Sequence, residues 1–192
     1  IYEHSTACTP TQWYRAKLSS ARVESPVLFT ALNEHYKKKP IARTEVVRWV
    51  AALNEEVEGI LYFPHDYAAG QKRPLVVMIH GGPPSTDFDA WEETFYVSAN
   101  SMCQRGAFVL KPNYHGSLNY GLRFAESIAA GKYYDLPVED IERGVDELIA
   151  RGLVDPDRLG VLGWSNGAIL TLASIVHSAR WKAASSGAGG AE

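Results

Sequence analysis

The stretch that decides the fold of this chain is Arg158-Leu159-Gly160-Val161-Leu162-Gly163-Trp164-Ser165-Asn166-Gly167-Ala168. Its first part is short and apolar, as a strand buried in a sheet would be. Residues 168–176 come next and are apolar nearly all round, which is typical of a helix buried against a sheet. The stretch therefore predicts a strand, a tight turn and a helix.

The spacing Gly163-x-Ser165-x-Gly167 fits a nucleophile elbow, a sharp turn that projects a serine hydroxyl above the sheet. The backbone of such a turn is strained, and glycine accepts that geometry at the least steric cost. The positive end of the following helix favours an oxyanion. We therefore expect Ser165 to be a catalytic nucleophile, with Gly163 and Gly167 as the structural glycines of the elbow. The alternative is an ordinary turn with a capping serine.

Composition narrows the function classes. The chain has 192 residues, 46% of them hydrophobic, which suits one packed domain or parts of two. A formal net charge of −3 gives no reason to expect a nucleic acid partner. No apolar run reaches the length of about 18 residues that would predict a membrane span, so we expect a soluble protein, cytoplasmic or periplasmic. Two isolated cysteines and six scattered histidines predict no disulfide framework and no metal site, and we expect no cofactor.

Residues 1–33 differ from the rest of the chain. Alternation over 13–18 and a short apolar run over 27–30 predict two strands around a turn. Two strands alone are not stable, so this segment is expected to pack on the main domain or on something outside the sequence. Residues 34–43 are polar and rich in lysine, and they predict a linker. Because the chain begins without a methionine or a signal-like region, we expect a processed protein or a piece of a longer one.

Residues 44–192 alternate strands with helices, which predicts an α/β fold with a mostly parallel, doubly wound sheet. The continuous apolar run 75–79 is the kind of strand that is buried on both faces of such a sheet. A second helix is expected to start near Pro137, with Asp135 as its N-cap. Helical spacing predicts a helix over 88–104 from Phe88, Trp91, Phe95, Ala99 and Met102. The other predicted strands are 46–51, 57–63, 108–110 and 181–186.

A second chemical motif, His80-Gly81-Gly82-Pro83, ends the apolar strand 75–79. It is therefore expected at the carboxyl edge, where such sheets bind ligands. Its glycines would let a backbone N–H approach a substrate oxyanion, and the N–H of Asn166 would supply a second donor. We expect His80 to support this loop rather than to act as the catalytic base. The alternative is a turn that merely ends a strand.

These motifs together resemble the catalytic domain of the prolyl oligopeptidase family, and within it the acylaminoacyl peptidases and bacterial dipeptidyl peptidase-like members. The resemblance covers about Thr44 to Glu192 and rests on the segments 75–84, 112–117, 144–149, 154–159 and 163–167. It implies an α/β-hydrolase fold, Ser165 as the nucleophile, and Gly82 and Asn166 as the oxyanion donors. Residues 1–33 resemble the last strands of the seven-bladed β-propeller that precedes this domain. One departure is His115, where the family usually has arginine.

The resemblance implies a serine peptidase that hydrolyses short peptides, at aminoacyl, dipeptidyl or acylaminoacyl bonds, through an acyl-enzyme on Ser165. Two alternatives stay open. A carboxylesterase would use the same scaffold, since acyl chemistry does not distinguish an ester from an amide. A non-catalytic binding protein could keep the elbow without a complete triad.

The chain itself has no complete triad after Ser165. On this fold the order is serine, then an acidic residue, then histidine. The only later histidine is His177, and at about 1.5 Å per helical residue it lies about 18 Å from Ser165. We therefore expect a further C-terminal segment, in the same polypeptide or in a separate chain, to bring the acidic residue, the catalytic histidine and two more strands.

Overall fold

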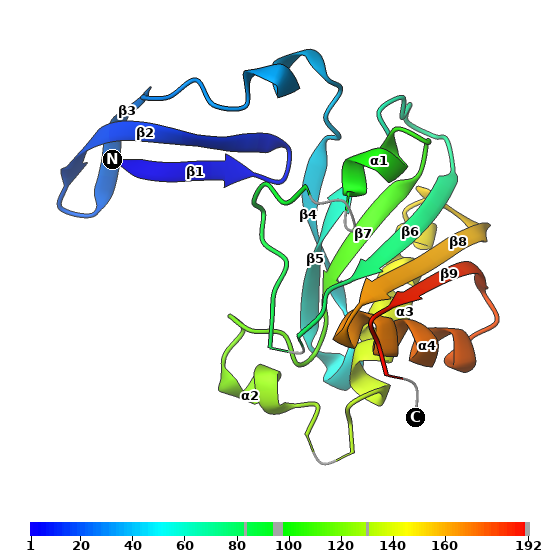
Figure 1. The fold of residues 1–192 in the computed structure, drawn as a ribbon. Coiled ribbons are helices and arrows are strands. Elements are labelled where there is room, and N and C mark those ends of the chain that lie inside the picture. The colour runs from blue at the N-terminus through cyan, green and yellow to red at the C-terminus, as the bar shows by residue number, and fades with distance from the viewer. Residues whose placement is uncertain (83, 94–97, 130, 191–192) are drawn as a thin grey trace.

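The computed structural model describes residues 1–82, 84–93, 98–129 and 131–190. Two β-sheets are present, one of three strands and one of six (Figure 1). The three-stranded sheet extends sideways from the body that holds the larger sheet and the longer helices.

The N-terminal sheet is an antiparallel meander of β1 (Tyr2–Thr6), β2 (Thr9–Ser19) and β3 (Arg22–Leu28). The sequence predicted β2 and β3 but not β1, whose residues carry no clear apolar alternation. A short 3-10 helix, η1 (Glu34–Lys38), occupies part of the predicted linker. Two backbone N–H groups join the sheet to the body: that of Ala7 donates to Asp89 Oδ1 at 2.8 Å, and that of Trp91 donates to Ser5 Oγ at 3.2 Å.

The larger sheet has the strand order β4-β5-β7-β6-β8-β9. The bounds of these strands are β4 (Thr44–Val50), β5 (Glu56–Tyr62), β6 (Arg73–Ile79), β7 (Phe108–Asn113), β8 (Val154–Trp164) and β9 (Trp181–Gly187). The β7, β6, β8 and β9 strands are parallel, while β4 and β5 form an antiparallel pair at one edge. The short 3-10 helix η2 (Ala52–Asn54) connects that pair. The mostly parallel sheet is therefore confirmed.

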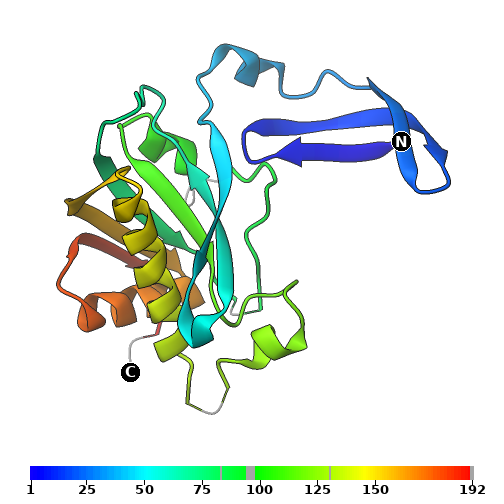
Figure 2. The same ribbon diagram turned by 180° about the vertical axis from the view of Figure 1, so that it is seen from behind.

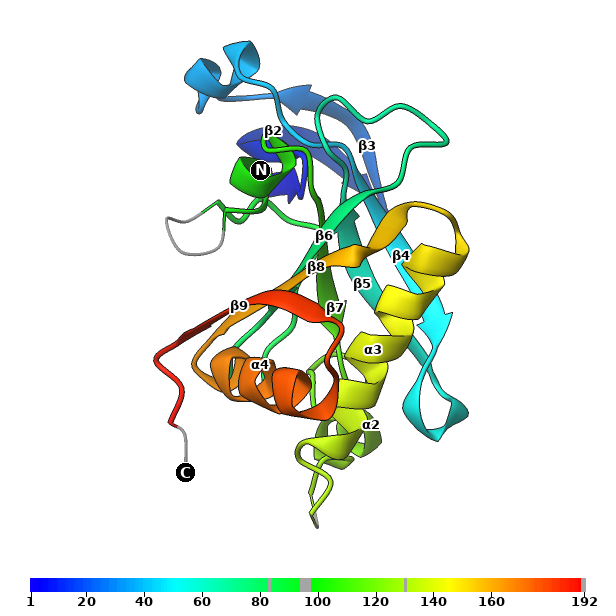
Figure 3. The same cartoon turned by 90° about the vertical axis from the view of Figure 1, so that its right-hand side faces the viewer.

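Helices cover both faces of this sheet (Figures 2 and 3). Helices α3 (Asp135–Ala150) and α4 (Asn166–His177) lie on one face, and α1 (Ala99–Cys103) lies on the other. Residues of β6 alternate between the two: Val77 and Ile79 join the core under α3 and α4, whereas Met78 joins the core under α1. This alternation explains why residues 75–79 are apolar throughout, and the doubly wound arrangement is confirmed.

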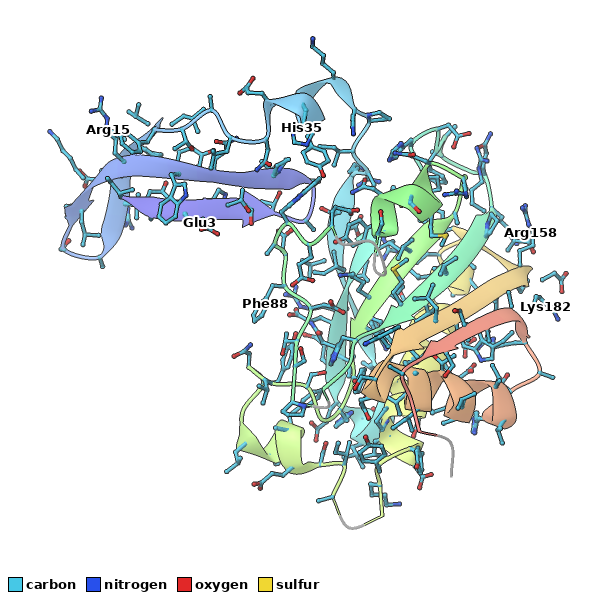
Figure 4. The ribbon with its side chains drawn as sticks, viewed as in Figure 1. Glu3, Arg15, His35, Phe88, Arg158 and Lys182 are labelled. Carbon is cyan, nitrogen blue, oxygen red and sulfur yellow. The ribbon has the colours of Figure 1, made fainter. Side chains whose placement is uncertain are left out.

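The helix predicted over 88–104 is wrong at its start. Among the described residues of this range, α1, Ala99–Cys103, is helical and residues 88–93 form an irregular segment, while Phe95 lies outside the described residues. The Phe88 side chain points away from the body and is 54% exposed (Figure 4). Polar groups at this place bind another element instead of a helix: Asp87 and Glu92 pair with Lys111 of β7.

One further prediction needs correction, and one helix was not expected. Asp135 is the first residue of α3 rather than its N-cap, and the N-cap residue Tyr134 makes no side-chain capping bond. The short helix α2 (Leu122–Glu126) was not predicted. Among the described residues, no helix is long and apolar enough to cross a membrane.

Candidate active site

Ser165 stands alone between β8, which ends at Trp164, and α4, which begins at Asn166. Its backbone has φ 56° and ψ −120°, a conformation that a residue with a side chain rarely adopts. The serine is exposed, and its N–H donates to the carbonyl oxygen of Gly187 at the end of β9, at 2.9 Å. The turn thus holds a strained serine at the surface, at the carboxyl edge of the parallel strands.

The glycines on either side of the serine are sterically required. A Cβ atom on Gly163 would lie 2.2 Å from the carbonyl oxygen of Gly167. A Cβ atom on Gly167 would lie 2.0 Å from the carbonyl oxygen of Ile79, at the end of β6. Any side chain at either position would therefore push α4 away from the sheet.

The strand order brings the His80-Gly81-Gly82 segment against this turn. Strands β6 and β8 are parallel neighbours, with Ile79 opposite Gly163. A Cβ atom on Gly81 would lie 3.3 Å from the Cβ atom of Ser165, so the two segments are in direct contact. Gly82 has φ +100°, which favours glycine, and Pro83 lies outside the described residues.

The two expected oxyanion donors lie on these two segments. In the described part of the chain, the N–H groups of Gly82 and Asn166 have no hydrogen-bond acceptor. Both groups are therefore available to an external acceptor. Gly82 follows β6 and Asn166 follows β8, and these two strands are neighbours in the sheet.

His80 is engaged in the loop and does not contact the Ser165 hydroxyl. Its Nδ1 lies 2.9 Å from the carbonyl oxygen of Gly81, which can only accept, so Nδ1 carries the proton. Its Nε2 then accepts from the Ser117 hydroxyl at 3.0 Å. Burial lowers the pKa of His80, which keeps the ring neutral. The expectation that His80 supports the loop is confirmed.

Of the other histidines, His115 is bonded to an acidic residue and His177 lies far from Ser165. His115 is buried and its Nδ1 lies 2.7 Å from Asp140 Oδ2. His177 ends α4, at the opposite end of the helix from Ser165. Across residues 1–82, 84–93, 98–129 and 131–190, no histidine nitrogen is hydrogen-bonded to the Ser165 hydroxyl.

Two tyrosines of the site were not identified from the sequence. The buried Asn166 side chain donates from Nδ2 to the Tyr114 hydroxyl at 3.1 Å, and its Oδ1 accepts from the Tyr133 hydroxyl. Tyr114 also stacks on His80, with ring centroids 4.4 Å apart. The sequence indicated only that Tyr114 follows the predicted strand 108–110, and the carboxyl ends of parallel strands are where such sheets bind ligands.

The profile of the prolyl oligopeptidase family matches residues 93–192, which is just over half of the chain. The chain belongs to the prolyl oligopeptidase family. Human dipeptidyl peptidase 8 is 32% identical over 135 residues, covering 69% of this chain and 15% of that protein. An uncharacterised peptidase of Bacillus subtilis is 28% identical over 176 residues, covering 91% of this chain and 26% of the relative.

Solved structures of family members share the fold. The acylaminoacyl peptidase of Pyrococcus horikoshii superposes with a TM-score of 0.80 at 24% identity, covering 98% of this chain and 29% of the enzyme. A puromycin-hydrolysing peptidase of Mycobacterium tuberculosis superposes with a TM-score of 0.73 at 26% identity, and the match covers 97% of this chain and 28% of that peptidase. The α/β-hydrolase fold is confirmed, and the chain spans less than a third of each of these relatives.

Proposed function

We propose that the protein carrying this chain is a serine peptidase in which Ser165 is the nucleophile. The observation that supports this most directly is the strained Ser165 backbone in contact with the Gly81 segment. Ser165 would attack the scissile carbonyl and form an acyl-enzyme, and water would then release the acid. The family relatives are named peptidases, which favours a peptide bond as the target.

The oxyanion of the tetrahedral intermediate would bind between the N–H groups of Gly82 and Asn166. Both donors are backbone groups: Asn166 begins α4 directly after Ser165, and Gly82 follows Gly81, which contacts Ser165. Preorganised donors of this kind stabilise the transition state by about 3–4 kcal/mol each. The start of α4 adds its positive dipole end at the same place.

The general base would be a histidine outside residues 1–192. A serine hydroxyl needs a positioned base to take its proton. Both ring nitrogens of His80 are bonded to other groups, His115 is buried with its Nδ1 bonded to Asp140, and His177 is too far away. We propose that this histidine and its acidic partner come from another part of the protein.

The substrates would be short peptides. The curated relatives include dipeptidyl peptidases and acylamino-acid-releasing enzymes, both named for the removal of small units from peptides. We propose that residues 1–33 belong to a separate β-domain, joined by residues 34–43 to the catalytic domain that begins at residue 44. Such a domain would restrict access to the site.

The full-length protein should be treated with a fluorophosphonate probe and the adduct mapped by mass spectrometry. We expect a single adduct on Ser165 and none in the Ser165→Ala variant. The same protein should then be assayed on dipeptidyl and aminoacyl anilides, acyl-peptides and simple esters. Turnover of esters alone would replace the peptidase by the carboxylesterase alternative, and an active protein labelled elsewhere would refute the nucleophile.

A further inference from the structure

The Tyr114 hydroxyl joins the two segments that carry the proposed oxyanion donors. Tyr114 follows β7 directly and is fully buried. Its hydroxyl donates to the carbonyl oxygen of His80 at 2.9 Å and accepts from Asn166 Nδ2 at 3.1 Å. One phenol group thus bonds the end of β6 and the residue after the nucleophile at the same time.

The glycine segment depends on such an anchor. Gly81 and Gly82 have no side chains that could pack, and glycine loses more conformational freedom on folding than any other residue. The neighbouring His80 provides side-chain and carbonyl contacts: Tyr114 stacks on its ring and bonds its carbonyl oxygen, and Ser117 bonds its Nε2. These contacts of His80 help to fix the position of the Gly82 N–H.

The Asn166 segment is held from the same side. The Asn166 amide has its Nδ2 on Tyr114 and its Oδ1 on Tyr133, so the side chain cannot rotate without breaking both bonds. Because burial raises the pKa of Tyr114, its hydroxyl keeps its proton and can donate to His80 while it accepts from Asn166.

We propose that Tyr114 is a positioning residue that sets the separation of the Gly82 and Asn166 N–H groups, and so the geometry of the oxyanion hole. This inference rests on the proposed function. Oxyanion stabilisation requires donors that are already in place when charge develops, because reorganisation during the reaction would consume the benefit. A loose hole would bind substrate normally and stabilise the transition state less.

The test is Tyr114→Phe in the full-length protein, which removes one oxygen and keeps the ring that stacks on His80. We expect kcat to fall by about tenfold with KM within about twofold, since only transition-state contacts are lost. The affinity for a peptide boronic acid, whose tetrahedral adduct mimics the intermediate, should fall by a similar factor. Tyr120→Phe is the matched control, because the Tyr120 hydroxyl also has two partners, Glu58 and Asn113, away from Ser165.

A double-mutant cycle with Asn166→Ala, which keeps the backbone N–H, tests the connection. If Tyr114 acts through the Asn166 side chain, the losses in kcat should be clearly less than additive. Full activity and boronate affinity in Tyr114→Phe, an equal loss in Tyr120→Phe, or additive losses would each overturn the inference. If Tyr114→Phe does not fold, Asn166→Ala breaks the same bond and should show the same kcat loss. Failure of Ser165 labelling in the wild-type protein would instead count against the proposed function.

Discussion

The imidazole of His115 and the carboxylate of Asp140 form a buried pair, with Nδ1 and Oδ2 2.7 Å apart. The same carboxylate accepts from the backbone N–H of His115 and from that of Ala52. Asp140 therefore ties α3 to the loop after β7 and to the connection between β4 and β5. His115 is also stacked on Phe124 of α2.

This pair predicts a pH-dependent stability. Burial by itself lowers the pKa of His115. The hydrogen bond and charge of Asp140, together with the nearby Glu55, raise this pKa by more than burial lowers it, so the net shift is upward. The guanidinium of Arg123 is paired with Glu55 and is a further charged group near His115. A histidine with a raised pKa stabilises the fold fully below its unfolded value of about 6.5, and the contribution is lost as pH rises through the folded pKa.

We therefore expect the difference in Tm between the full-length wild type and His115→Gln to be largest in mild acid and to shrink as pH rises above about 6.5. Thermal unfolding at a series of pH values measures it. A difference for His115→Gln that grows with pH would contradict the charged pair.

Gly167→Ala should destabilise the fold severely. The new Cβ atom would lie 2.0 Å from a backbone oxygen of Ile79, which cannot move without distorting β6. Overpacking typically costs about 1–3 kcal/mol, and a clash with backbone should exceed that range. Gly160→Ala in β8 is the control, because its Cβ atom would have no neighbour nearer than 3.8 Å. Soluble yield and Tm measure the contrast, and equal values for the two variants would contradict the tight turn.

Gly82→Val should reduce catalysis more than it reduces stability. The valine would place a branched side chain at φ +100° beside the proposed oxyanion site. We expect kcat to fall by about a hundredfold or more, the scale for losing one donor. Gly70→Val carries a similar backbone strain, φ +86°, in an open loop and should keep its activity. Unchanged kcat in a folded Gly82→Val protein would mean that the donor lies elsewhere.

Lys111→Met should be strongly destabilising. The Lys111 side chain is 5% exposed and its Nζ lies 3.2 Å from both Asp87 Oδ1 and Glu92 Oε2. Burial by itself lowers the pKa of Lys111, but the neighbouring acidic groups, Asp87 above all, raise it by more than that. The net shift is upward, so the ammonium stays charged. Removing one partner of a buried ion pair costs about 3–5 kcal/mol, because the other charge is left without compensation.

Denaturant unfolding of the full-length protein measures this cost. Lys132→Met is the control, since Lys132 is 58% exposed and pairs with Asp135 only at 3.8 Å. An exposed pair of this kind contributes about 0–1 kcal/mol. A loss for Lys111→Met as small as that for Lys132→Met would show that the buried pair does not hold the segment around Asp87 in place.

The sequence alone predicted the features that depend on short stretches of the chain. The spacing of Gly163, Ser165 and Gly167 predicted the turn, because a Cβ atom on Gly163 would meet the backbone of Gly167 four residues along the chain. The apolar run 75–79 predicted a central strand, since a strand covered on both faces has no polar side. The family resemblance of residues 44–192 rests on the same short motifs.

Only the tertiary structure decided the features that join distant segments. The residues from 88 onward have helical spacing, yet Asp87 and Glu92 pair with Lys111 of β7, and residues 88–93 are irregular. Tyr114 acts on both His80 and Asn166, and His115 meets Asp140, because three chain segments converge at one sheet edge. Hydrogen bonds and ion pairs need angstrom-scale placement of groups far apart in the chain, which local periodicity does not encode.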